Sequence, residues 1–161
     1  MLNGLAFAIL LIACCYLAWR YGGGPERIGV AILTIGSVLT LAVVSAPVSR
    51  FHSVEIGILL VDTVALLSFL ALALFAERLW PLWVTSLHAV GTAGHAVKLV
   101  DPQVIGSAYQ FALAFWSYPM LLLIALGTWN HQKRLARFGV DKSWSSFSGR
   151  SGHRPPAGPI S

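Results

Sequence analysis

The chain has 161 residues, of which 57% are hydrophobic and only 11% are charged, and its formal net charge is +5. Soluble domains carry about 25% charged residues, so this composition excludes an ordinary water-soluble domain and indicates a surface covered by lipid. Six of the eleven Lys and Arg residues follow position 130. A basic end beside an apolar segment indicates membrane orientation and contact with anionic lipid. Nucleic-acid binding is not expected, because no folded basic domain is present to carry it.

Five apolar stretches follow one another along the chain, and each has the length of a membrane-spanning helix, about 17–25 residues. The strands of a membrane β-barrel would be about half as long and would alternate in polarity, and this pattern is absent. The sequence therefore predicts an all-α, polytopic membrane protein whose transmembrane domain covers residues 1–130. The five predicted spans are residues 2–19, 28–46, 56–76, 80–99 and 104–128.

Short segments that disfavour helices separate these stretches. Gly22-Gly23-Gly24-Pro25 forms the first break, and residues 47–53 form the second. Glu77-Arg78 is the whole third connection, so the third and fourth helices are expected to form an antiparallel hairpin. Pro81 is tolerated just after it, because an N–H in the first turn has no helical partner. Asp101-Pro102 ends the fourth helix, since the residue before a proline is pushed out of the helical region.

The distribution of Lys and Arg predicts the orientation, because these residues are enriched in cytoplasmic loops. With the C-terminus inside, Arg20, Arg27, Arg78 and the six residues after position 130 are cytoplasmic, which makes nine of eleven. Arg50 and Lys98 are then outside. We therefore expect the N-terminus outside and the C-terminus in the cytoplasm, in a membrane such as the bacterial inner membrane.

Leu11-Ile12-Ala13-Cys14 offers a competing interpretation, because it matches the signal at which a bacterial lipoprotein is cleaved before its cysteine. The preceding residues contain no Lys or Arg, although secretory signals carry a positive region there. Cleavage would also leave four spans and place the basic end on the wrong side. The plain interpretation of Cys14 and Cys15 is two small thiols buried in the membrane.

The residues after the fifth stretch divide into two segments. Residues 131–142 are basic and are expected to continue as a short juxtamembrane helix. Lys133, Arg134 and Arg137 would contact anionic lipid headgroups there, at about 1 kcal/mol per basic residue. Residues 143–161 are rich in Ser, Gly, Pro and Arg, and such a composition predicts a disordered tail.

Ionisable residues inside the spans are the best indicators of a site, because each is costly in hydrocarbon. Asp62 lies in the third span, and His88 and His95 lie in the fourth. The histidines are seven residues apart, nearly two turns, so they share one face about 10 Å apart along the axis. Hairpin depth places Asp62 opposite residues 92–94, within reach of Thr92 and His95.

Two glycines lie on or near the same face of the fourth span. Gly91 and Gly94 would allow another backbone to approach, as small residues do in membrane helix packing. In the fifth span, Pro119 is expected to kink the helix and free a carbonyl near residue 115. The aromatic residues Trp19, Trp80, Trp83 and Trp129 are expected to form an interfacial belt.

The polar cluster of Asp62, His88, Thr92 and His95 has three interpretations. It would act as a proton relay or ion site, it would hold the hairpin together by a buried hydrogen bond, or Asp62 would be protonated by burial. A haem between helices is disfavoured, because a bis-histidine site needs a histidine on a second span at matching depth. The identity of any metal or other cofactor is left open.

No enzyme motif is present, and the short loops leave no soluble domain for catalysis, so an enzyme is disfavoured without being excluded. The leading interpretation is an accessory subunit that packs against a membrane-protein partner or a second copy of itself. The alternative is a small proton- or ion-coupled transporter using the Asp/His cluster. A cofactor-binding membrane protein comes third. A water-accessible path to Asp62 would favour the transporter over the accessory subunit.

Overall fold

The computed structural model describes residues 2–43, 56–100 and 115–145. Expectations that concern the second loop, Asp101-Pro102, residues 104–114 and the tail beyond residue 145 lie outside the described residues, as does the side chain of Lys98. Most of the described chain is helical, which confirms the all-α fold there. The helices are α1 (Leu2–Tyr21), α2 (Gly24–Val43), α3 (Ile56–Phe75), α4 (Trp80–Val100) and α6 (Ser117–Phe138).

Three of these described helices are long and apolar enough to cross a membrane. They are α1 over Gly4–Tyr21, α2 over its whole length, and α3, which is the most apolar. α4 is as long but contains two histidines and several hydroxyl residues, and α6 ends in basic residues. The apolar composition of α1, α2 and α3 is that of a membrane protein.

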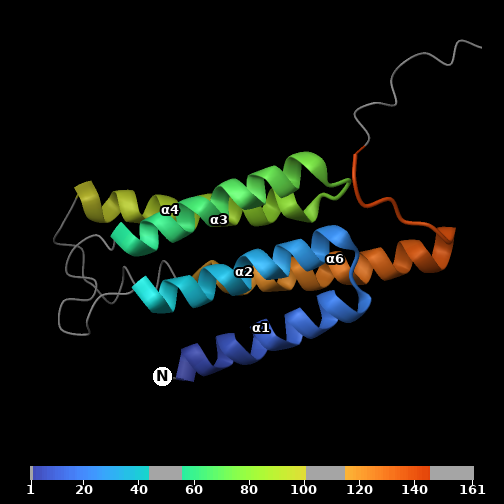
Figure 1. Ribbon diagram of the computed structural model, residues 1–161, viewed down its shortest axis with the longest axis horizontal. Coiled ribbons are helices and arrows are strands. Elements are labelled where there is room, and N and C mark those ends of the chain that lie inside the picture. Colours follow the sequence, from blue (N-terminus) through green and yellow to red (C-terminus); the bar gives the residue numbers. More distant parts are fainter. Residues whose placement is uncertain (1, 44–55, 101–114, 146–161) are drawn as a thin grey trace, which may run out of the picture.

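The helices run side by side in three layers, with the α3–α4 hairpin on one side, α2 and α6 in the middle, and α1 on the other (Figure 1). α2 packs against α1, α3 and α6, and α6 also packs against α1 and α4. The α1–α2 turn, the α3–α4 turn and the C-terminal end of α6 gather at one end of the bundle, opposite the N-terminus (Figure 1). We name this the basic end, because seven cations lie there: Arg20, Arg27, Arg78, Lys133, Arg134, Arg137 and Lys142.

The core runs along the axis between the layers and draws side chains from all five helices. Its fully buried members include Ala18, Phe69, Val84 and Ile124. Large apolar side chains elsewhere point outward, as expected for helices whose outer faces meet lipid.

Trp80 is buried at the basic end of this core, with only 7% of its surface exposed. A Cβ added at Gly29 or at Gly127 would lie 2.5 Å from its ring, so both glycines are needed to make room for the indole. The expectation that Trp80 belongs to an interfacial belt is therefore wrong. Trp19, Trp83 and Trp129 are all exposed at their surface positions.

The first turn of the chain is tighter than the Gly-Gly-Gly-Pro sequence predicts. α2 begins at Gly24 and not at residue 28, so only Gly22 and Gly23 separate it from α1. Pro25 fits in the first turn because its missing N–H needs no helical partner. Glu26 Oε2 accepts a hydrogen bond from the Gly23 N–H at 3.0 Å, which satisfies one donor at the start of the helix.

α6 is one helix that contains both the end of the last apolar stretch and residues 131–138 of the basic segment, so the helix expected over 131–142 is four residues shorter. It ends at Phe138, where Gly139 adopts a left-handed conformation (φ 72°) and donates its N–H to the Leu135 carbonyl. This is a glycine C-cap. Pro119 lies in the first turn of α6, and Trp116 just before that helix has helical dihedrals (φ −66°, ψ −19°). The kink expected within the fifth span stays a prediction, because residues 104–114 lie outside the described residues.

Residues 139–145, which we name the strap, turn back from α6 to the α3–α4 turn (Figure 1). The Glu77 N–H donates to the Ser143 carbonyl, and the Ser145 N–H donates to the Phe75 carbonyl at 2.9 Å. Residues 143–145 are thus ordered, although their composition assigns them to the tail. Backbone pairing orders them, and it does not depend on apolar content.

Candidate functional site

Asp62 contacts both histidines of α4 across the α3–α4 hairpin. His88 Nε2 lies 3.0 Å from the Asp62 backbone carbonyl, and His95 Nε2 lies 3.1 Å from Asp62 Oδ2. One residue reaches both rings because a helix carbonyl points toward the C-terminus, whereas the Cα–Cβ bond tilts toward the N-terminus. In the antiparallel hairpin, the carbonyl therefore faces His88 nearer the turn, and the carboxylate faces His95 farther from it.

The hydrogen-bond partner determines that Nε2 of His88 carries a hydrogen, but it does not determine this for Nε2 of His95. A carbonyl oxygen only accepts, so His88 Nε2 carries a hydrogen and donates it. The Asp62–His95 hydrogen bond can form in two protonation states of Asp62. An ionised Asp62 accepts from His95 Nε2–H, and a protonated Asp62 donates its O–H to a bare Nε2. His95 is 1% exposed, whereas 22% of the Asp62 side chain is accessible.

Thr92 is the remaining residue of the predicted cluster, and its hydroxyl donates to the His88 carbonyl within α4 at 2.9 Å. A Cβ at Gly91 would lie at ordinary contact distance, 3.4 Å, from Trp116, so α4 packs closely there against the start of α6. Gly94 is half-buried. The structure brings together Asp62, His88 and His95, whereas the Thr92 hydroxyl bonds to the backbone of its own helix.

A central cavity of about 320 Å³ adjoins this cluster. All five helices contribute to its wall. Its apolar lining includes Phe7, Ile58 and Met120. Its polar lining residues are Ser37, Thr40, Asp62, His88 and Ser117. Asp62 is the acidic residue of this wall, and its accessible fraction opens into a space large enough for water or a small solute.

A second polar cluster, at the basic end, was not predicted from the sequence. Its centre is Glu26 of α2, which is fully buried. Glu26 Oε1 accepts from Trp80 Nε1 at 2.9 Å and pairs with Arg78 Nε at 3.4 Å. The small number of acidic residues is the sequence feature that could have indicated this cluster. The chain has only six acidic residues, and Glu26 stands in a helix first turn beside a proline.

Asp141 of the strap completes this cluster. Its Oδ2 accepts from Arg78 Nη2 at 2.7 Å and from His131 Nδ1, and its Oδ1 accepts from Arg134 Nε at 2.9 Å. Burial raises the pKa of this carboxyl, but the hydrogen bonds from Arg134 and His131 and the charges of Arg78 and Arg134 outweigh it. The pKa of Asp141 is therefore held below its usual value of 3.8, and the group is ionised at neutral pH.

Metal and haem binding find little support in this geometry. Within 2–43, 56–100 and 115–145, no three His, Cys, Asp or Glu side chains gather closely enough to hold a metal ion. The Nε2 atoms of His88 and His95 both face Asp62, so axial ligation through them would break both contacts with α3.

Comparison of the chain with protein-family models, with curated proteins and with solved structures finds no match. The function therefore has to be argued from the site itself.

Proposed function

We propose that the chain is a five-span membrane protein with a cytoplasmic C-terminus that takes up and releases a proton at the Asp62–His95 pair. The proton would be coupled to the passage of a small solute or ion through the central cavity. α4 and α6 supply the fourth span and the end of the fifth. The gathering of seven cations at one end of the bundle supports the orientation.

The observation that carries this proposal is the cavity beside Asp62. A carboxylate that only held the hairpin together would need no accessible space on its other side. Here 22% of the Asp62 side chain is accessible, and the neighbouring wall carries Ser37, Thr40 and Ser117. Polar groups of this kind hold water, which can deliver a proton to a buried carboxylate.

The chemistry follows from the two forms of the hydrogen bond. An ionised Asp62 beside a neutral His95 carries one negative charge, which is costly in a low-dielectric interior. Uptake of one proton neutralises the pair, whether the proton lies on the carboxylate or on the imidazole, and the hydrogen bond between them persists. The site can therefore change its charge without losing the contact between α3 and α4.

The accessory-subunit function remains the alternative, and it differs in what it requires. A subunit that acts only by packing on a partner needs neither the cavity nor an ionisable group at position 62. Replacement of Asp62 by an isosteric amide therefore separates the two functions.

We would measure charge displacement after a pH jump, using proteoliposomes adsorbed on a solid-supported membrane. Protonation of Asp62 inside the bilayer should give a transient current, and Asp62→Asn should reduce it at least tenfold. Ser68→Ala is the matched control, because Ser68 is in the same helix and its hydroxyl bonds only to the Val64 carbonyl. A full transient in Asp62→Asn, with normal folding, would contradict the proposal and leave the packing function.

A further inference from the structure

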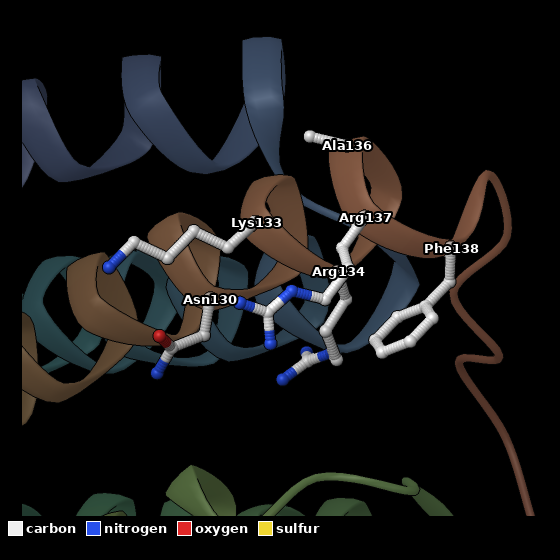
Figure 2. A pocket seen from close by; sticks show the side chains of 6 residues that line it. All are labelled: Asn130, Lys133, Arg134, Ala136, Arg137 and Phe138. Carbon is white, nitrogen blue, oxygen red and sulfur yellow. The ribbon is translucent and has the colours of Figure 1, made fainter.

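The last two turns of α6 form a basic hollow on one side of the helix. Asn130, Lys133, Arg134 and Arg137 line it at spacings of three, four and seven residues, which place them on one helix face. Their polar ends extend to the same side of α6, with the Phe138 ring beside them (Figure 2). The hollow has a volume of about 610 Å³ and is open to the surroundings.

The charges of this hollow are only partly compensated. Asp141 pairs with the Nε of Arg134, but the same carboxylate also pairs with Arg78 and His131. Among the described residues, Arg137 makes no ion pair, and the Nη2 atom of Arg134 is buried without a hydrogen-bond partner. A buried N–H without a partner is unfavourable, so this atom favours the arrival of an acceptor.

The guanidinium of Arg134 is also held in place before any ligand arrives. Its Nε–H is fixed on Asp141 Oδ1 at 2.9 Å, so the remaining nitrogens have limited freedom. A fixed guanidinium loses little entropy when it binds a phosphate through two parallel hydrogen bonds.

The surroundings place the hollow where lipid headgroups lie. Lys133 Nζ lies 4.7 Å from the centre of the Trp129 ring, and Trp129 is 61% exposed. An exposed tryptophan at the junction of an apolar and a basic segment is typical of the membrane interface. Phe138, at the far side of the hollow, is also exposed.

We propose that this hollow binds the phosphate of one anionic phospholipid per chain, with Arg134 and Arg137 donating to its oxygens. Lys133 contributes charge, and the Asn130 amide donates a further hydrogen bond. This is a stoichiometric site, and it differs from diffuse attraction, to which every basic residue near the surface contributes about equally. The proposal is independent of the proton chemistry at Asp62.

The test is native mass spectrometry of the full chain released from detergent and titrated with phosphatidylglycerol or phosphatidylcholine. Phosphatidylglycerol should bind first with a stoichiometry of one and at least tenfold more tightly. Arg137→Ala should weaken this first event about tenfold. Arg27→Ala removes the same charge at the same end, where Arg27 lies over Trp19, and should change the affinity less than twofold. Arg134→Lys keeps the charge and should still weaken binding, because lysine lacks the planar fork.

Three results would overturn the proposal. Equal weakening by Arg27→Ala and Arg137→Ala would show diffuse attraction. Equal affinity for the two lipids would exclude recognition of an anionic headgroup. Displacement of phosphatidylglycerol by an equal concentration of inorganic phosphate would assign the hollow to free phosphate. Arg137→Ala decides the matter alone if Arg134→Lys does not fold, since Arg137 makes no ion pair within the described chain.

Discussion

The bundle places a carboxylate beside a histidine in two regions, and the partners differ. At the basic end, Asp141 accepts from Arg78, Arg134 and His131. In the middle of the hairpin, the Asp62 carboxylate pairs with His95. Two guanidinium groups, which never lose their protons, keep the first carboxylate ionised. The second carboxylate faces an imidazole, which can act as a hydrogen-bond donor or acceptor, so it is the second pair to which the proposed function assigns a change of charge.

The surroundings of the two regions reinforce this difference. The basic-end cluster joins the α1–α2 turn, the α3–α4 turn, α6 and the strap, so it connects the bundle and has many simultaneous partners. The Asp62 cluster joins α3 and α4 and faces the central cavity. This difference indicates that the basic-end cluster stabilises the fold, whereas the Asp62 cluster has the accessible carboxylate that proton transfer requires.

The largest effect is expected from Glu26→Ala at the basic end. This change leaves the Trp80 N–H and the Gly23 N–H without their buried acceptor and removes the carboxylate that pairs with Arg78 Nε at 3.4 Å. Loss of one partner of a buried ion pair costs about 3–5 kcal/mol, which thermal unfolding in detergent would register. Glu77→Ala is the control, because its ion pair with Lys142 is exposed and contributes about 0–1 kcal/mol. Equal destabilisation by the two changes would remove the structural role assigned to this cluster.

A smaller loss is expected from Gly127→Ala, which tests how the same region packs. The new Cβ would lie 2.5 Å from Trp80 Cδ1 and must displace the ring that holds Glu26. Overpacking of this kind costs about 1–3 kcal/mol of the free energy of unfolding. Gly36→Ala is the matched control in α2, since nothing lies within 4 Å of its added methyl group. If both variants unfold at the same temperature, the indole is not confined as described.

In the Asp62 region, Asp62→Leu should destabilise the chain by about 1–3 kcal/mol, because it leaves the buried His95 ring without its carboxylate. Ser68→Leu, in the same helix, should change stability less. A double-mutant cycle with His95→Ala measures the contact itself, because residues that touch are non-additive. Strict additivity would show that the two side chains do not interact in the membrane.

The smallest effect is a difference in pH dependence between the regions. The folded-state pKa of Asp141 is lowered, so its stabilising contribution is fully present above pH 3.8 and is lost as the pH falls through the folded value. Unfolding temperatures of the wild type should therefore fall in this acid range. Asp141→Asn should be less stable at neutral pH and should flatten that decline. An unchanged acid limb in Asp141→Asn would contradict the lowered pKa.

Much of the fold follows from the sequence, because apolar length and the breaking residues decide where helices lie. A short connection at Glu77-Arg78 predicts the hairpin and the depth of Asp62, although in the structure four residues, 76–79, separate α3 from α4. The structure then places the Asp62 carboxylate 3.1 Å from His95 Nε2. The rotation of α3 about its own axis could not be predicted, because this helix has apolar side chains on all of its faces.

The composition of the basic-end cluster was not predicted, because its members lie far apart in the chain. Glu26, Arg78 and Asp141 come together only after the two turns and the strap have packed. The burial of Trp80 was not predicted for a related reason. A tryptophan near a span end is typical of the interface, and its burial depends on Gly29 and Gly127 in two other helices.

The most direct test of the central claim is infrared difference spectroscopy of the protein in lipid between neutral and acidic pH, compared with Asp62→Asn. We expect a band of the Asp62 carboxylic acid or of the His95 imidazolium to appear on mild acidification in the wild type and in Asp141→Asn, and that band to be absent from Asp62→Asn. Its presence would show that the Asp62–His95 pair exchanges a proton inside the membrane. Identical difference spectra for the wild type and Asp62→Asn, with both folded, would contradict the account.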